Sequence, residues 1–375
     1  MICSYCFDSK NIYDFIQDNG EKAPPNYDCE VCGERNHPKV GDLHIMQKSE
    51  LSKKLKEVIR KLYTHIYEYA LPNNAVEPYI TLEEVCWEVF DNGDKIAELI
   101  ASESVYETAD GGDGYFDDTD SQQWLPICWL TPDSFDWDGF TKKVKHSLRF
   151  FDTVDFNRKE ELEKLDIFFE KLYTDNIDEL VYRTRGISEK DKEDIELNPS
   201  ENLGKAPPKL AKHNRFSPSG ISYIYLASDE KTAIYEAYDE SRELYAVGKF
   251  KLDSDLRFID LRKSVFNEKL QSYIDPYSEE FEALTYCASK AAEKFVVDIQ
   301  KPIKNNSKDL DYLPTQILAE YIQSLGYDGF VFDSSKNRGG YNIVLFHEQM
   351  SYASHQYKNV SLIAVRLGIS EIEEG

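Results

Sequence analysis

The chain has 375 residues, a length that fits two or three domains, each large enough to bury a core of its own. It contains 44 Lys and Arg against 69 Asp and Glu, which gives a formal net charge of -25 at pH 7. A charge of this sign repels phosphate backbones and argues against a general nucleic-acid binder. It does not exclude a basic pocket for one small anion, because salt screens the long-range field over ~8 Å.

Targeting features are missing from the sequence. No stretch approaches the ~20 consecutive apolar residues of a membrane helix. The first ten residues lack the basic and apolar regions of a signal peptide. The sequence therefore predicts a cytoplasmic protein with no membrane partner, a compartment in which paired cysteines favour metal binding over disulfides.

Two Cys-x-x-Cys pairs occur near the start of the chain, Cys3 with Cys6 and Cys29 with Cys32. Each pair brings two thiolates to one edge of a tetrahedron, and two pairs complete a four-cysteine zinc site with no position left for substrate. We expect residues 1–45 to be a zinc knuckle that the metal stabilises, since so small a segment does not fold alone. Four unrelated buried thiols are the alternative.

Helical periodicity dominates residues 46–178. Thr81 and Glu84 have the spacing of a capping box at a helix start. The helices expected here span 48–70, 81–90, 94–105 and 137–151, with a charged connector helix in 155–180. Residues 110–120 are rich in Gly and Asp and predict a loop.

This helical region resembles the HEPN-type domain, whose ribonuclease motif is an Arg followed by a His after four to six residues on one helix. Arg60 and His65 have that spacing, but on the first expected helix, whereas the family usually carries the motif late. In the late helix, residues 142–149 place the His before the Arg. We therefore expect Arg60 and His65 to have surface or core-edge roles.

From residue 179 onward strands and helices are mixed. The strands expected are 221–227, 244–252, 257–261, 327–333 and 341–347, and the helices are 229–238, 279–297 and 314–325. They do not alternate regularly, so the fold class is α+β multidomain and not a doubly wound sheet. We expect one mixed-sheet domain over 179–350, and a C-terminal extension over 351–375 in which 361–367 could add an edge strand.

Several motifs in this domain resemble the RES domain in order and spacing, a family named for its Arg, Glu and Ser. They are Arg215–Ala227, Thr232–Glu236, Tyr312–Gln316, Gly326–Phe330, Ser334–Ser335 and Asn342–Phe346. The resemblance implies a fold similar to that of ADP-ribosyltransferases and degradation of NAD+ as substrate, by hydrolysis or with inorganic phosphate as co-substrate. It also implies a toxin or defence effector, because many members are toxins of toxin–antitoxin pairs. Zinc-knuckle and HEPN-type segments often precede such domains.

Glu236 is the candidate catalytic carboxylate. The nicotinamide nitrogen of NAD+ is positively charged, so cleavage develops positive charge on the ribose and needs no proton on the leaving group. One carboxylate therefore suffices. Glu236 lies in an expected helix between Ala233 and Ala237, small residues that permit close approach of a ligand. Without the surrounding motif, a solvated helix face would be the better interpretation.

Arginines are expected to bind the phosphates, since a guanidinium pairs with phosphate oxygens through two parallel hydrogen bonds. Arg215 precedes the first strand of the RES motifs, and the family places another arginine where this chain has Arg183 and Arg185. Residues two apart in a strand share a face, so both can point into the site. A surface salt bridge is the alternative for at least one of them.

The other candidates are polar residues on or after strands. Tyr225 lies eleven residues before Glu236, a separation that the family keeps, and is a candidate catalytic residue with Ser334. Tyr223 shares a strand face with Tyr225, and core packing is the alternative for both tyrosines. Ser335 and Asn342 complete the ligand-binding candidates.

Two other functions remain open from the sequence. An ADP-ribosyltransferase acting on a macromolecule would use the same pocket, and an RNase or interaction module would use the HEPN-like region. NAD+ depletion is toxic, so we also expect an inhibitory or triggering protein partner, or masking within a homo-oligomer. A charge of -25 favours a basic inhibitor.

Overall fold

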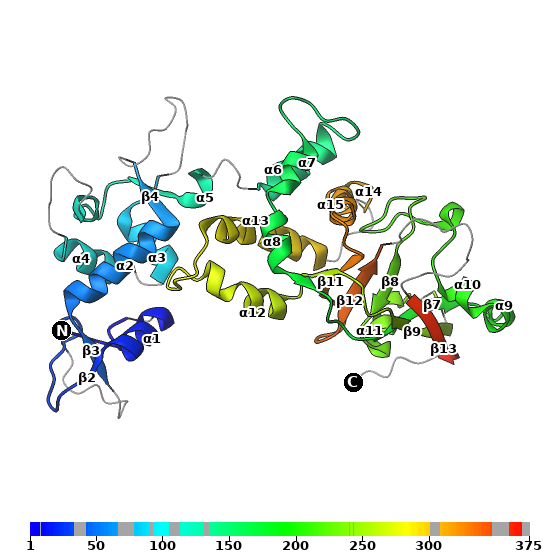
Figure 1. The fold of residues 1–375 in the computed structure, drawn as a ribbon, viewed down its shortest axis with the longest axis horizontal. Coiled ribbons are helices and arrows are strands. Elements are labelled where there is room, and N and C mark those ends of the chain that lie inside the picture. The colour runs from blue at the N-terminus through cyan, green and yellow to red at the C-terminus, as the bar shows by residue number, and fades with distance from the viewer. Residues whose placement is uncertain are drawn as a thin grey trace. The chain divides into compact units, whose positions relative to one another are not determined.

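The structure is a computed structural model that describes residues 1–7, 9–33, 43–66, 79–90, 93–104, 113–130, 135–239, 241–242, 244–300, 308–346 and 360–369. Contacts divide the chain into two compact units (Figure 1). Unit 1 comprises Met1–Ser134 and Tyr273–Leu284, and unit 2 comprises Phe135–Ser272 and Thr285–Gly375. The division into four segments stays a prediction from the sequence.

Unit 1 combines short strands with helices. Its elements are β1 (Ile2–Cys3), α1 (Lys10–Asn19), β2 (Glu21–Lys22), β3 (His44–Met46), α2 (Lys48–Leu62), β4 (Tyr63–His65), α3 (Leu82–Phe90), α4 (Gly93–Ser102), a 3-10 turn at Asp113–Phe116, β5 (Trp124–Pro126) and α5 (Ile127–Leu130). The first three strands form an antiparallel sheet in the order β1-β3-β2, and β4 pairs with β5.

The predicted start of α3 is confirmed, whereas the predicted length of α2 is wrong. Glu84 N donates to Thr81 Oγ1 at 3.1 Å and Thr81 N donates to Glu84 Oε2 at 2.8 Å, which is the reciprocal capping box. The helix expected to continue to residue 70 ends at Leu62. The next residues, Tyr63–His65, pair with β5, because an aromatic and β-branched run is better suited to a strand.

Unit 2 is built on an eight-stranded mixed sheet in the order β13-β9-β7-β8-β12-β11-β10-β6. The strands are β6 (Tyr173–Thr174), β7 (Leu180–Ile187), β8 (Ile224–Ala227), β9 (Leu244–Leu252), β10 (Phe258–Asp260), β11 (Gly329–Asp333), β12 (Tyr341–Leu345) and β13 (Val360–Ile369). Only β10 and β11 are parallel neighbours within the described sheet. The α+β class is confirmed, and so is the edge strand, which is β13.

Unit 2 also contains helices before and between the strands of this sheet along the chain. They are α6 (Trp137–His146), α7 (Arg158–Glu163), α8 (Asp166–Lys171), α9 (Asp191–Leu197), α10 (Pro199–Leu203), α11 (Glu230–Ala237), α12 (Lys263–Ile274), α13 (Ala283–Gln300), α14 (Lys308–Asp311) and α15 (Leu313–Ser324), with a 3-10 turn at Pro208–Leu210. Helix α12 was not predicted from the sequence, and α6 ends at His146, five residues before the predicted end. Phe295 of α13 packs against Trp137, Phe168 and Phe169, so aromatic rings join α6 and α8 to α13.

Alternation along the central strands separates the core from the site. Ile224 and Leu226 of β8 and Ile343 and Leu345 of β12 belong to one buried apolar cluster. Tyr225, between the two β8 residues, points to the opposite face, as the period of two requires. The polar residues of these strands are therefore collected on one side of the sheet.

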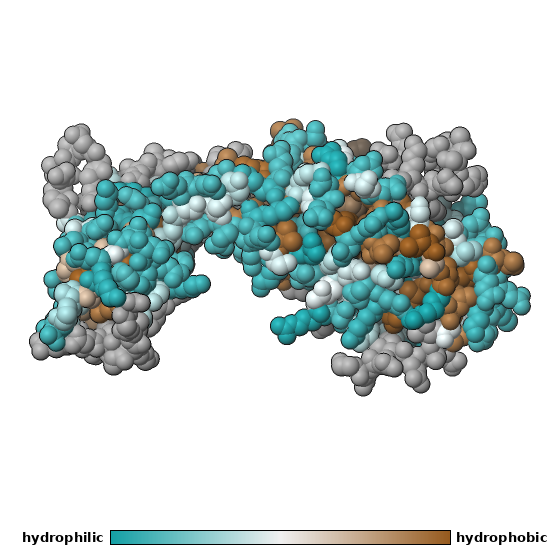
Figure 2. Space-filling model, turned by 60° about the horizontal axis from the view of Figure 1, so that its bottom comes forward, coloured by the Kyte–Doolittle hydropathy of each residue, from teal (hydrophilic) through white to brown (hydrophobic). Residues whose placement is uncertain are grey.

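The surface of the protein is mostly hydrophilic, as its high content of charged residues predicts. Figure 2 shows mostly hydrophilic residues on the face in view, with hydrophobic residues gathered mainly over unit 2. Among the helices of the described ranges, none combines the length and apolar character needed to cross a membrane.

The close approach of β11 to β12 gives a test of the sheet. A Cβ at Gly329 would lie 2.1 Å from the Val344 carbonyl oxygen, whereas a Cβ at Gly248 of β9 would meet only side-chain atoms, at 2.8 Å and beyond. We expect Gly329→Ala to lower the free energy of unfolding of unit 2 by about 3 kcal/mol, and Gly248→Ala by about 1 kcal/mol, because side chains move more easily than a paired strand. Urea denaturation measures both, and equal losses would contradict the pairing.

Candidate functional site

A cavity of about 400 Å³ lies in unit 2. Six of the nine predicted catalytic and ligand-binding residues line it: Arg183, Arg215, Tyr225, Glu236, Ser335 and Asn342. Ser334 is hydrogen-bonded to one of these residues, whereas Arg185 and Tyr223 are not part of the lining. The cavity therefore brings together carboxylate, guanidinium, phenol and amide groups that are far apart in the sequence.

Strand register explains this assembly. The neighbours β7, β8 and β12 place Tyr182 opposite Ala227 and Ala227 opposite Asn342. Directly paired residues of antiparallel strands have side chains close together on one face. Tyr182, Tyr225 and Asn342 thus contribute to one wall from three strands, and Arg183, the next residue of β7, also lines the cavity.

Glu236 is held by two donors on the same oxygen. Ser334 Oγ donates to Glu236 Oε1 at 2.6 Å, and Asn342 Nδ2 donates to it at 2.9 Å. Lys336 Nζ donates to the backbone oxygens of Tyr235 and Glu236 at 3.1 Å, a favourable place for a cation at the end of α11. Within the described residues Oε2 accepts no hydrogen bond, so this oxygen is available to a ligand.

Arg215 lies in the irregular segment before β8. Its Nη1 donates to the Asp298 backbone oxygen at 3.4 Å, and its guanidinium lies 5.9 Å from the centroid of the Tyr312 ring. Burial lowers the pKa of the Arg215 guanidinium, while the charges of Tyr312 and Glu236 act in the opposite direction. A guanidinium starts from a pKa above 12 and stays charged.

The two arginines of β7 have different surroundings. Arg183 lines the cavity and its guanidinium donates to the Gly204 backbone oxygen. Arg185 is exposed and its Nη1 donates to the Asn202 backbone oxygen at 3.0 Å. Both reach the same short segment, as residues that share a strand face should, but only Arg183 is placed to meet a ligand in the cavity.

The two candidate tyrosines, Tyr223 and Tyr225, also have different surroundings. Tyr225 is hydrogen-bonded to the hydroxyl of Ser217 at 3.0 Å at the cavity wall, and burial raises the pKa of Tyr225 to about 12. Tyr223 is buried, donates to Gln323 Oε1 at 3.1 Å and packs edge-on against Phe346. Core packing accounts for this position of Tyr223.

Other lining residues were not anticipated from the sequence. Ile299 and Gln300 come from the end of α13, which extends three residues beyond the predicted helix. Phe332 and Asp333 precede the predicted serines, and strand periodicity alone does not reveal that they face a cavity. Thr184 also lines it, and its buried Oγ1 has no hydrogen-bond partner in the part of the chain that the structure describes.

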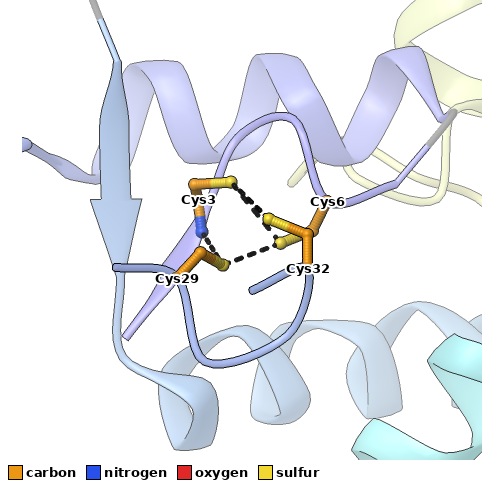
Figure 3. A group of neighbouring side chains, drawn as sticks. All are labelled: Cys3, Cys6, Cys29 and Cys32. Carbon is orange, nitrogen blue, oxygen red and sulfur yellow. Dashed lines mark hydrogen bonds between the residues drawn. The ribbon is translucent and has the colours of Figure 1, made fainter. Parts of the chain in front are cut away.

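A second candidate site lies in unit 1, where the four predicted zinc ligands meet (Figure 3). All four Sγ atoms lie within 4.8 Å of one another, with Cys6–Cys29 at 3.1 Å and Cys3–Cys6 at 3.5 Å. Tetrahedral zinc with Zn–S bonds of ~2.3 Å spaces its sulfurs by about 3.8 Å, so the cluster has the size of a zinc site. Cys3 N also donates to Cys29 Sγ at 3.4 Å, a contact that stabilises a thiolate, and Cys32 completes the set.

Arg60 and His65 do not form the helical pair of the ribonuclease motif. Arg60 lies in α2 and its guanidinium is over the ring of Phe116, 5.1 Å from the centroid. His65 lies in β4, is 1% exposed, and stacks on Tyr115. The interpretation of the two as residues of one helix is wrong, and their core-edge surroundings account for their positions.

Comparisons with known proteins agree with part of this picture. Residues 198–364 match the RES domain. This range includes Arg215, Tyr225, Glu236, Ser334 and Asn342, and it confirms the resemblance predicted from the motifs. No curated protein matches the chain.

One solved structure with some similarity is that of the M. tuberculosis MbcT-MbcA toxin-antitoxin complex. The likeness covers 55% of this chain and 92% of that chain, at 15% identity and a TM-score of 0.32. A likeness of this size supports no argument about function. The resemblances to ADP-ribosyltransferases and to HEPN domains stay predictions from the sequence.

The half-buried phenol of Tyr225 gives a prediction of its titration. Its pKa is raised to about 12 in the folded chain, against about 10 for a free tyrosine. The folded state thus binds the proton more tightly, and the stability contributed by Tyr225 is complete below pH ~10 and is lost as pH rises to about 12. In NMR spectra of ring-labelled tyrosine, the resonance that Tyr225→Phe removes should titrate near pH 12, and titration near pH 10 would contradict its burial.

Proposed function

We propose that this protein degrades NAD+ by breaking the bond between nicotinamide and ribose. The observation that carries the proposal is the Glu236 carboxylate, which has one oxygen fixed by Ser334 and Asn342 and lines the same cavity as Arg183 and Arg215. The match of residues 198–364 to the RES domain supports it. The choice of NAD+ as the substrate rests on the resemblance of the sequence motifs to the RES domain.

The chemistry follows from the charges. When the glycosidic bond breaks, its electron pair stays on the nicotinamide nitrogen, which becomes neutral, and positive charge develops at the ribose carbon. Glu236 Oε2 would stabilise that charge, and the two donors on Oε1, which fix the plane of the carboxylate, support this role. Arg183 and Arg215 would pair with the pyrophosphate.

The incoming oxygen completes the reaction. Water would form a new bond to the ribose carbon and release a proton, giving ADP-ribose. Inorganic phosphate would form the bond without that proton release and give the 1″-phosphate of ADP-ribose. A macromolecular acceptor would make the enzyme an ADP-ribosyltransferase, so the product distinguishes the three reactions.

The decisive test incubates the purified full chain with NAD+, with and without phosphate, and identifies the products by mass spectrometry. We expect Glu236→Gln to reduce nicotinamide release at least about 100-fold, the loss typical of a group that stabilises transition-state charge. The matched control is Glu230→Gln on the same helix, where the carboxylate pairs with Arg366 at the surface. It should retain activity.

The alternatives give different results. Unchanged nicotinamide release by Glu236→Gln would exclude the proposed role of this carboxylate. Cleavage only in the presence of a protein or nucleic-acid acceptor would replace NAD+ degradation by ADP-ribosyl transfer. Absence of both NAD+ binding and cleavage by the wild-type chain would contradict the proposal.

We further propose that the protein is a toxin or defence effector restrained by a protein partner or by homo-oligomeric masking. Loss of NAD+ harms the cell that makes the enzyme, which is the reason to expect restraint. The same Glu236→Gln variant tests this in cells, because wild-type expression should deplete NAD+ and arrest growth while the variant does not. Equal growth of both strains without any added partner would contradict restraint by a separate protein. Equal growth together with a wild-type chain that is monomeric in solution would contradict the role as a toxin.

The four-cysteine cluster is proposed to bind a structural zinc ion. Thiolate ligands at all four corners leave no position for substrate, so the metal would stabilise the fold of this part of unit 1. Metal analysis should find about one zinc per wild-type chain, and Cys29→Ser should lose it. Cys86→Ser, which alters a buried cysteine outside the cluster, is the control and should keep it. Equal zinc content in all three proteins would exclude the site.

A further inference from the structure

The first turn of α15 is attached to the segment that carries Arg215. Thr315 Oγ1 lies 2.6 Å from the Arg215 backbone oxygen, and Gln316 Nε2 donates to the Asn214 backbone oxygen at 2.7 Å. Both side chains are only 4% exposed. Two buried donors of one helix therefore meet two consecutive carbonyl groups from a part of the chain about a hundred residues earlier.

These contacts matter because Arg215 has no regular structure to hold it. Residues 211–223 form neither helix nor strand, between the turn that ends at Leu210 and the start of β8 at Ile224. The guanidinium donates a long hydrogen bond of 3.4 Å to the Asp298 backbone oxygen and also interacts with Tyr312. A charged side chain on an irregular segment loses affinity for its ligand if it must be ordered on binding.

Thr315 has a second carbonyl within reach. Its Oγ1 lies 2.9 Å from the Tyr312 oxygen, which is the usual local contact of a threonine in a helix. A hydroxyl has one proton, and the shorter distance, to Arg215, indicates where it is donated. Gln316 Nε2 lies 2.7 Å from the Asn214 backbone oxygen and 3.4 and 3.5 Å from the ring nitrogens of His213, so all of these contacts attach it to the segment before Arg215.

We infer that Thr315 and Gln316 are positioning residues, which set the backbone of Arg215 so that its guanidinium is ready to bind the phosphate groups of a ligand. The inference rests on the proposed function for the identity of that ligand, NAD+. The part of the inference that does not depend on NAD+ is the preorganisation of Arg215 for a pyrophosphate group. The affinity of the chain for inorganic pyrophosphate measures it directly.

The test compares matched substitutions in the full chain by calorimetric titration with pyrophosphate. Gln316→Leu should weaken binding about three- to tenfold, the effect of one lost hydrogen bond. Gln323→Leu is the control. Gln323 lies on the same helix, α15, but its side chain accepts a hydrogen bond from Tyr223 and does not contact Arg215 or Asn214. It should bind pyrophosphate as the wild type does.

Thr315 gives an independent pair of variants. Thr315→Val keeps the shape and removes the hydroxyl, so it should weaken pyrophosphate binding, and Thr315→Ser should restore it. Thermal unfolding of each variant shows whether unit 2 remains folded. If Gln316→Leu does not fold, the Thr315 pair still decides the question.

A double substitution separates positioning from general damage. If Gln316 acts through Arg215, then adding Gln316→Leu to Arg215→Ala should cause no further loss of pyrophosphate binding. If Gln316 had only a general structural role, Gln316→Leu would reduce pyrophosphate binding by the same factor in the wild-type chain and in the Arg215→Ala chain. Additive losses, or an equal loss in Gln323→Leu, would overturn the inference.

The positioning role of Thr315 and Gln316 can be tested separately from the proposed cleavage of NAD+. Wild-type chain that binds pyrophosphate through Arg215 but does not cleave NAD+ would contradict the proposed function and leave the positioning role measurable. Cleavage of NAD+ with a KM that Gln316→Leu does not change, together with unchanged pyrophosphate binding, would overturn the positioning role alone. Absence of Arg215-dependent pyrophosphate binding in the wild type would also overturn it.

Discussion

The site depends above all on the pairing of β8 with β12. This register places Asn342 opposite Ala227 and puts Ile343 and Leu345 into the core. A shift by one residue would exchange the faces, so that Asn342 would be buried among apolar side chains and Glu236 would lose one of its two donors. Core packing and the geometry of the carboxylate therefore select the same register.

The cavity does not share the strongly negative charge of the whole chain. A net charge of -25 should repel an anionic dinucleotide at long range. Inside the cavity, however, Arg183 and Arg215 balance two carboxylates, and both carboxylates already accept a hydrogen bond: Glu236 from the Ser334 hydroxyl and Asp333 from the Lys263 backbone NH. Because contacts over a few ångströms are screened much less than the outer field, the local arginines decide which ligand fits. An acidic protein can thus hold a site for phosphates.

The sequence predicted the site better where an ordered motif was present than where only periodicity was. The motif residues Tyr225, Glu236 and Asn342 meet at one cavity. Periodicity alone missed α12 and continued α2 through Tyr63–His65, because a short amphipathic run fits a helix or a strand until its partner strand is known. The two Cys-x-x-Cys pairs meet in one cluster for a different reason, since each spacing brings two thiols together in a local turn, and the zinc ion itself stays a proposal.

What the sequence could not reveal is how the irregular parts of the site are held. Asn337 Nδ2 donates to Thr232 Oγ1 at 2.7 Å and ties the loop after β11 to α11, and Gln316 ties the Arg215 segment to α15. Each of these bonds joins residues separated by more than a hundred positions, beyond any local pattern. Glu236, by contrast, is fixed by the helix on which it lies. The carboxylate is thus positioned by regular structure, whereas the segments that carry Ser334 and Arg215 are tied by a few side chains from distant elements. Small substitutions far along the chain should therefore affect ligand binding before they affect the fold.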